Sequence, residues 1–216
     1  MELIYIGDPM CSWCYGFGKA LDLLVTRFPT LDLRIVVGGL RASATDVLDD
    51  AGKQFRLQHW ARVEQMSGLP FNRQGLLDRK NFVYDTEPVC RAVVAARGLA
   101  PEANILAVFR ALQHAFYVEA LDTTDGVVLA EVVARALKRQ DIDIAAETIL
   151  GKWSNAATVA DTQADFTLVR SWNITSFPVL ALRVGNELHA LTTGYTSVEM
   201  LERRLAVLLE GVEALN

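Results

Sequence analysis

Two cysteines, Cys11 and Cys14, stand between a short apolar run and a helical pattern. The run from Leu3 to Ile6 is typical of a buried strand, and apolar residues then recur at helical spacing as far as Phe28. A Cys-x-x-Cys pair at a strand-to-helix junction is the arrangement of a thiol–disulfide active site. A helix N-terminus lowers the pKa of a nearby thiol, which favours the nucleophilic thiolate. The sequence therefore predicts a redox-active pair at this junction.

Two other interpretations of the pair have to be weighed against disulfide exchange. A structural zinc site needs four ligands, so two further side chains would have to join the pair. The remaining cysteine and the histidines are not spaced as ligands in the sequence: Cys90, His59, His114 and His189. No metal site is therefore predicted. The second interpretation is a pair of inert buried cysteines, because free cysteine is often buried.

Composition narrows the class of protein and of partner. The chain has 216 residues, of which 51% are hydrophobic and 22% are charged, as expected of a folded globule. The formal net charge is −5 and no basic cluster is present, which argues against a nucleic-acid partner. No apolar run reaches the ~18 residues of a membrane span, and the N-terminus has no signal-peptide pattern, so we expect a cytoplasmic protein without membrane contact.

Strand patterns are confined to the two ends of the chain. After the first strand and helix, Leu31 to Val37 reads as a second strand, which a right-handed crossover would make parallel to the first. Near the C-terminus, the segment 177–184 is followed by a tight turn and an antiparallel strand over 188–191. The pattern Thr196 to Glu199 resembles a capping box and opens a last helix.

The middle of the chain contains helical patterns and no convincing strand. Helices are expected from Val47 to Met66, from Asp85 to a closing Gly98, from Pro101 to Phe116, from Thr124 to Leu137, after Asp143, and from Asn155 to Trp172. The fold class is therefore α/β, in the order β-α-β, helices, β-β-α. We expect one α/β domain over residues 1–42 and 156–216, with an all-helical domain inserted over residues 43–155.

Four segments in this order resemble a known family: Asp8 to Phe17 around the cysteine pair, Val37 to Arg41, Asp85 to Pro88, and Thr175 to Val179. They are similar to the thioredoxin fold with a large inserted helical domain that the DsbA family has. Within this family the likeness is to the FrnE-like branch of predicted protein disulfide isomerases. The first and last segments are specific when taken together, and the middle two are supportive.

The resemblance implies a cis peptide bond between Phe177 and Pro178, in a loop that would lie against Cys11. The backbone of such a loop pairs with an extended substrate, so Phe177 and Pro178 are predicted substrate-binding residues. The alternative is an ordinary trans proline at the start of an edge strand. Trp13 would line the substrate surface or serve in packing. Asp8 is expected to be a solvated loop residue.

These observations predict a thiol–disulfide oxidoreductase, DsbA-like and a candidate protein disulfide isomerase. Cys11, nearest the helix start, is the expected attacking sulfur, and Cys14 is the expected resolving sulfur. No cofactor is implied beyond this pair, with disulfide-containing proteins or small thiols as substrates and glutathione as a candidate reductant or substrate. Whether the protein oxidises, reduces or isomerises is left open, because the intervening Ser12-Trp13 dipeptide tunes the potential.

Two other functions remain open. One is a glutathione-dependent isomerase or transferase of the kappa-class type, although those relatives usually have serine where Cys11 stands. The other is a redox-sensing chaperone or binding protein. The third thiol, Cys90, is expected to be buried and inert, with a regulatory role as the alternative.

Overall fold

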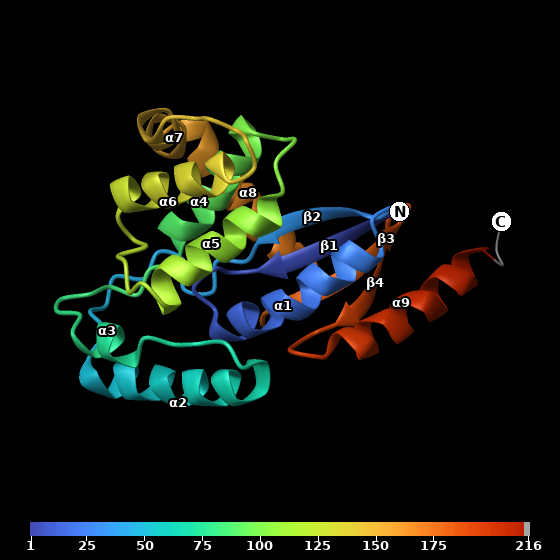
Figure 1. Ribbon diagram of the computed structural model, residues 1–216, viewed down its shortest axis with the longest axis horizontal. Coiled ribbons are helices and arrows are strands. Elements are labelled where there is room, and N and C mark those ends of the chain that lie inside the picture. Colours follow the sequence, from blue (N-terminus) through green and yellow to red (C-terminus); the bar gives the residue numbers. More distant parts are fainter. Residues whose placement is uncertain (214–216) are drawn as a thin grey trace.

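The computed structural model describes residues 1–213 and contains a four-stranded mixed sheet (Figure 1). The strands are β1 (Glu2–Gly7), β2 (Asp32–Val37), β3 (Val179–Val184) and β4 (Glu187–Thr192). Their order across the sheet is β2-β1-β3-β4. β1 pairs in parallel with β2 and antiparallel with β3, and β3 pairs antiparallel with β4. The predicted β-α-β and β-β-α ends are confirmed.

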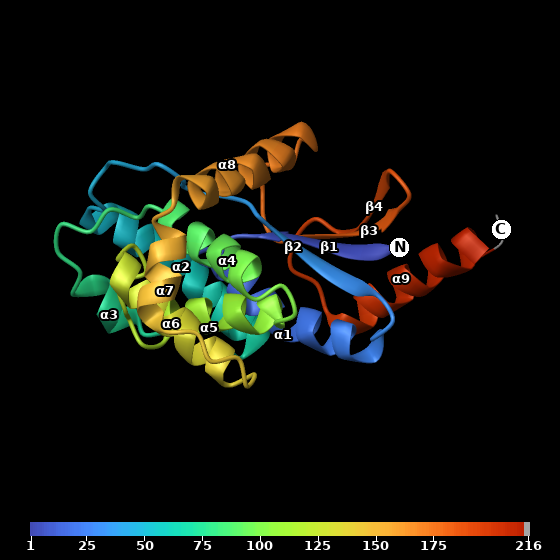
Figure 2. The same ribbon diagram turned by 90° about the horizontal axis from the view of Figure 1, so that it is seen from above.

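Helices cover both faces of this sheet. Figure 2 shows α8 (Ala156–Ser171) on one face, with α1 (Ser12–Arg27) and α9 (Val198–Glu213) on the other. The sequence of β1 explains why both faces are buried, because consecutive side chains of a strand point to opposite faces. Ile4 and Ile6 pack beneath α8 with Val169, whereas Leu3 and Tyr5 face the larger core on the side of α1.

The remaining helices form a block at the end of the sheet where β1 leads into α1 (Figures 1 and 2). They are α2 (Asp50–Ser67), α3 (Arg73–Leu77), α4 (Glu87–Leu99), α5 (Ile105–Tyr117), α6 (Gly126–Lys138) and α7 (Ala146–Trp153). The expected α/β fold with inserted helices is confirmed. The exact domain boundaries stay a prediction. Across residues 1–213 no helix is long and apolar enough to cross a bilayer.

The structure corrects several predicted helix ends. Val47 precedes α2 and forms an isolated bridge with Val83. The helix begins later than predicted because Asp49 is its N-cap, with a side chain that accepts from the amide of Gly52. α3 was not expected from the sequence. Gly98 lies within the last turn of α4 and does not end that helix.

α2 approaches the first turns of α1 closely because Gly16 has no side chain. A Cβ atom at this position would lie 2.5 Å from Cγ1 of Val63. Trp60 follows on the same side of α2 and packs edge-on against Phe116 and Tyr117 of α5. This packing holds α2 over the segment that carries the two cysteines.

Candidate active site

Cys11 and Cys14 lie at the start of α1, where the sequence predicts them. Cys11 is the N-cap residue, and its carbonyl oxygen accepts from the amide of Tyr15 at 3.0 Å. Cys14 lies one turn further along and is completely buried, whereas Cys11 retains 6% of its accessible surface. All three cysteines are free thiols. Because Cys11 is the more exposed of the two, a molecule that approaches from solvent contacts Cys11 before Cys14.

The loop before Cys11 is fixed by Asp8, which is completely buried and not the solvated residue that we expected. Its Oδ1 atom accepts from the amide of Met10 at 2.8 Å, and its Oδ2 atom accepts from the amide of Leu40 at 2.7 Å. The Cys90 thiol donates to Oδ2 at 3.7 Å. Burial raises the pKa of Asp8 from 3.8 to about 6, although hydrogen bonds from Thr86, Leu40, Met10 and Cys90 act to lower it.

Cys90 is buried, as expected, and its position ties it to this carboxylate. It lies in the first turns of α4, so Asp8 joins the active-site loop to α4 and to the segment after β2. Burial raises the pKa of the Cys90 thiol, and the neighbouring Asp8 charge raises it further. A protonated, buried thiol is a poor nucleophile, so the regulatory alternative gains no support from this geometry.

The loop before β3 lies against the first cysteine. The peptide bond between Phe177 and Pro178 is cis, which confirms that expectation. The Cys11 thiol donates to the carbonyl oxygen of Phe177 at 3.8 Å. Gly38 makes room for the Phe177 ring, because a Cβ atom at position 38 would lie 2.2 Å from Cζ of that ring.

A cavity of about 410 Å³ opens beside Cys11. Its apolar wall includes Trp13, Phe55 and Trp60, and the Phe177 loop closes another side. Trp13 therefore does line the cavity, and its ring also packs against that of Tyr195 at a centroid distance of 6.0 Å. The packing role of Trp13 is therefore observed, and its contact with substrate stays a prediction.

The cavity also has a basic side that the sequence did not reveal, formed by Arg41, Arg56 and His59. Arg41 pairs with Asp46 through its Nη2 atom at 3.0 Å, and its buried Nε finds no hydrogen-bond partner within the described part of the chain. Arg56 lies over the Tyr84 ring, with 4.3 Å between the guanidinium carbon and the ring centroid.

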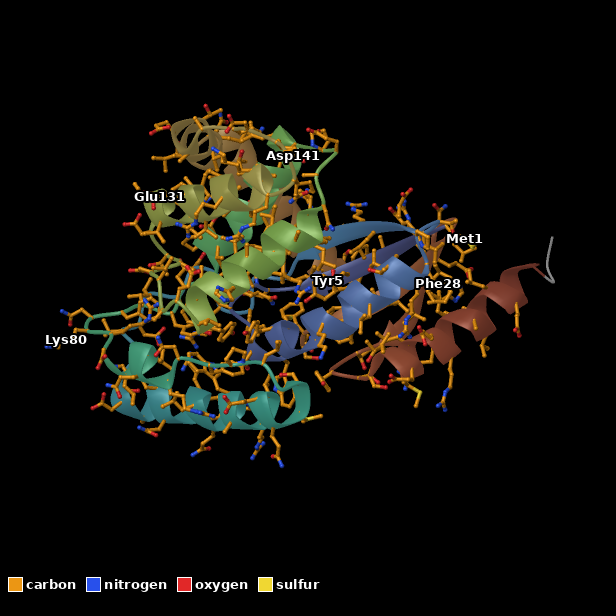
Figure 3. All side chains as sticks on the ribbon, in the orientation of Figure 1. Met1, Tyr5, Phe28, Lys80, Glu131 and Asp141 are labelled. Carbon is orange, nitrogen blue, oxygen red and sulfur yellow. The ribbon has the colours of Figure 1, made fainter. Side chains whose placement is uncertain are left out.

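Tyr5 lies where β1, α1 and α5 meet (Figure 3), with its ring against those of Phe17 and Phe109. Burial raises the pKa of the Cys14 thiol well above its usual value, and the neighbouring Cys11 raises it further. The backbone amide of Asp8 and the hydroxyl of Tyr5 act in the opposite direction and lower the pKa of Cys14. Burial likewise keeps the pKa of the Tyr5 phenol well above 10, so this hydroxyl is a donor.

The arrangement suits a two-step exchange of sulfur partners. An accessible cysteine at a helix N-terminus attacks a disulfide, and a second cysteine one turn away displaces the product. Within residues 1–213 no three His, Cys, Asp or Glu side chains cluster as metal ligands.

Comparisons with solved structures identify proteins of this architecture. A "putative protein disulfide isomerase" from Nitrosomonas europaea is 30% identical, with a TM-score of 0.85, over 97% of this chain and 98% of that chain. The cytosolic disulfide reductase DsbM from Pseudomonas aeruginosa is 27% identical over 100% of both chains, with a TM-score of 0.77. A structure of DsbM with GSH is 26% identical over 97% of this chain and 98% of that chain, with a TM-score of 0.75. No family model and no curated protein matches the chain.

Proposed function

Because this chain belongs to the DsbA family of thioredoxin-fold thiol–disulfide oxidoreductases, we propose that Cys11 and Cys14 form its redox-active pair. The protein is an enzyme of thiol–disulfide exchange. The observation that carries the assignment of residues is the difference in access between the two sulfurs. Cys11 borders the cavity and keeps 6% of its surface, whereas Cys14 is fully buried behind it.

In the first step, the Cys11 thiolate attacks one sulfur of a substrate disulfide. A bond forms between Cys11 and that sulfur, the substrate S–S bond breaks, and the departing sulfur takes up a proton. Cys14 then attacks Cys11, releases the second substrate thiol and leaves a Cys11–Cys14 disulfide. The carbonyl of Phe177, beside Cys11, and the following Pro178 offer backbone groups to an extended substrate.

We propose glutathione as the small thiol that returns the pair to the dithiol form. One glutathione thiolate would attack Cys11, a second would release glutathione disulfide, and the two cysteines would end as thiols. The cavity suits this ligand, because Arg41 and Arg56 line it and guanidinium groups can pair with the two carboxylates of glutathione. The similarity to DsbM, described as a cytosolic disulfide reductase and solved with GSH, supports the reducing direction and a cytoplasmic setting.

Equilibration in glutathione redox buffers, followed by thiol alkylation and mass analysis, tests the proposal. We expect reversible closure of Cys11 and Cys14, with a midpoint of about −200 to −230 mV, as for glutaredoxins. A midpoint near −120 mV would instead identify an oxidant. Cys11→Ser should abolish exchange, and Cys14→Ser should retain a glutathione adduct on Cys11.

Two outcomes would refute the assignment of the pair. Full turnover by Cys11→Ser would show that another group is the nucleophile. A wild-type pair that never closes but binds glutathione tightly would favour the glutathione-dependent transferase or the binding protein. Cys90→Ser is the matched control, because its thiol is buried against Asp8 and should leave the midpoint unchanged.

A further inference from the structure

The resolving cysteine has to become an anion in a place that water does not reach. Cys14 is completely buried, and its attack on Cys11 requires the loss of its proton. A buried anion needs hydrogen-bond donors directed at it. Two groups act in this way and lower the pKa of the Cys14 thiol, the backbone amide of Asp8 and the side chain of Tyr5.

The Tyr5 hydroxyl is a buried donor without an ordinary partner. Tyr5 is 1% exposed, and its hydroxyl makes no hydrogen bond of normal geometry among the described residues. Leaving a buried hydroxyl without a hydrogen bond is destabilising, so an unpaired one in a native core calls for an explanation. Tyr84, which lines the cavity, is placed differently, because its hydroxyl donates to the carbonyl of Met10 at 2.6 Å.

The packing of Tyr5 holds its ring beside the turn of α1 that follows Cys14. Its ring stacks on Phe17 at a centroid distance of 6.1 Å, and Phe17 lies one turn beyond Cys14 on the same side of α1. Phe109 of α5 holds the ring edge-on at 5.5 Å. The hydroxyl extends over Gly7, where a Cβ atom would lie 2.6 Å from it. The absence of a side chain at position 7 therefore lets the hydroxyl reach the end of β1, close to the loop that leads into α1.

We propose that the Tyr5 hydroxyl donates a hydrogen bond to the Cys14 thiolate while Cys14 resolves the mixed disulfide on Cys11. This inference rests on the exchange reaction proposed above. In the step concerned, the Cys14–Cys11 bond forms, the bond from Cys11 to the substrate sulfur breaks, and the proton lost by Cys14 is balanced by the one that the departing thiolate takes up. Tyr5 keeps its own proton and stabilises the charge only while it resides on Cys14.

The ionisable groups around Cys14 are few. Cys11 faces it from the helix cap, Asp8 from the preceding loop and Tyr5 from β1. Asp8 directs its backbone amide at Cys14, while its carboxylate is held by Met10, Leu40 and Cys90. Tyr5 is therefore the side chain whose hydroxyl can be removed without disturbing this carboxylate.

The test is Tyr5→Phe, followed by rapid mixing of the reduced protein with glutathione disulfide and acid quenching. The rate at which Cys11 acquires glutathione should be unchanged. The rate at which Cys14 then releases it should fall about tenfold or more, the loss expected for one hydrogen bond to a charged group. The pH profile of this second step should move to higher pH, which a purely structural role would not cause. An unchanged second step with an unchanged pH profile would overturn the proposal.

Tyr117→Phe is the matched control. Its hydroxyl is also buried and also makes no hydrogen bond of ordinary geometry among the described residues, but after burial the groups that raise its pKa are Tyr84, Cys11 and Asp8 and do not include Cys14. We expect both glutathione steps to keep their wild-type rates in this variant. Equal slowing in Tyr117→Phe and Tyr5→Phe would attribute the effect to loss of core packing and overturn the role of Tyr5. Failure of the exchange reaction itself would appear differently, as a wild-type protein that never acquires glutathione on Cys11.

Discussion

Asp8 organises the active-site loop with a single carboxylate. Its two oxygens accept from two backbone amides that are far apart in the sequence, those of Met10 and Leu40. Thr86 adds a third contact and itself accepts from the amide of Arg41 at 3.0 Å, so the contacts join three segments around the cysteines. The cost of this arrangement is the burial of a charge, which a full set of donors offsets only in part.

The cost of burying the Asp8 carboxylate should appear in the pH dependence of the free energy of unfolding. Burial raises the pKa of Asp8 to about 6 in the folded protein, against 3.8 as its ordinary value. Between these values the folded state holds a proton that the unfolded chain has lost, so the free energy of unfolding falls as pH rises through this window. At about 1.4 kcal/mol per pKa unit, the Asp8 contribution amounts to roughly 3 kcal/mol.

Asp8→Asn should lack this dependence, because the amide does not titrate. Urea unfolding of wild type and variant at several pH values between about 4 and 7 gives the difference in unfolding free energy. We expect the wild type to lose roughly 2 kcal/mol of this contribution relative to Asp8→Asn across this range, because part of the shift lies below pH 4. Asp161→Asn, at an exposed carboxylate of α8, is the control and should run parallel to the wild type. A constant difference between wild type and Asp8→Asn would contradict the shifted pKa.

At the scale of elements, α2 forms the outer wall of the cavity. It carries two strongly exposed apolar side chains, Phe55 and Met66, but only Phe55 lines the cavity. The Phe55 ring also contacts that of His59 edge-on, with 4.7 Å between centroids. An exposed aromatic at the rim of a basic cavity offers apolar contact to a ligand whose charges are bound deeper inside.

Phe55→Ala should therefore weaken substrate binding without altering the sulfur chemistry. We expect kcat/KM for glutathione disulfide to fall roughly fivefold to tenfold, mainly through KM, since about 1 kcal/mol of apolar contact is lost. Steady-state kinetics over a range of substrate concentrations measures this change. Met66→Ala removes an equally exposed side chain from the same helix and should have wild-type kinetics. A similar loss in both variants would mean that α2 acts through its stability and not through contact.

Local patterns predicted the strands and most helices because each has a clear apolar period or cap. The cysteine pair was also predictable, since the Cys-x-x-Cys spacing and the neighbouring strand and helix patterns lie close together in the sequence. The basic side of the cavity was not predictable from the sequence, because Arg41 and Arg56 come from separate segments and meet only after α2 folds over α1. The burial of Asp8 was missed because its partners, such as Leu40 and Cys90, come from other parts of the chain. Side chains that only tertiary contacts bring together produce no periodic pattern in the sequence.

At the scale of the whole molecule, the sheet and the inserted helices share one core. Leu3 and Tyr5 of β1, Phe17 of α1 and Phe109 of α5 belong to the same buried cluster. The inserted helices are therefore not an independent appendage, and Cys14 lies at the boundary between the two parts. We infer that the position of the active site depends on the helical block and the sheet remaining packed together.

An ion pair between Arg97 and Asp165, beside the sheet, is among the contacts that join these parts. Asp165 of α8 is almost fully buried, and its Oδ2 atom accepts from the amide of Val37 at 3.1 Å and from Nη1 of Arg97 at 3.0 Å. The same Nη1 atom of Arg97, in α4, also donates to the carbonyl of Ile35 at 2.7 Å. The pair therefore connects a helix of the inserted block, a helix of the α/β part and β2 at once.

Arg97→Ala would leave the Asp165 carboxylate buried without its cation, which typically costs about 3–5 kcal/mol. We expect this loss in the free energy of unfolding, with a single transition that coincides in far-UV and near-UV circular dichroism, because the shared core couples the two parts. Arg34→Ala, at an exposed position of β2, should change stability by less than about 0.5 kcal/mol. Separate transitions for the two signals in Arg97→Ala would instead show that this ion pair, and not the shared core, makes the helical block and the sheet unfold together.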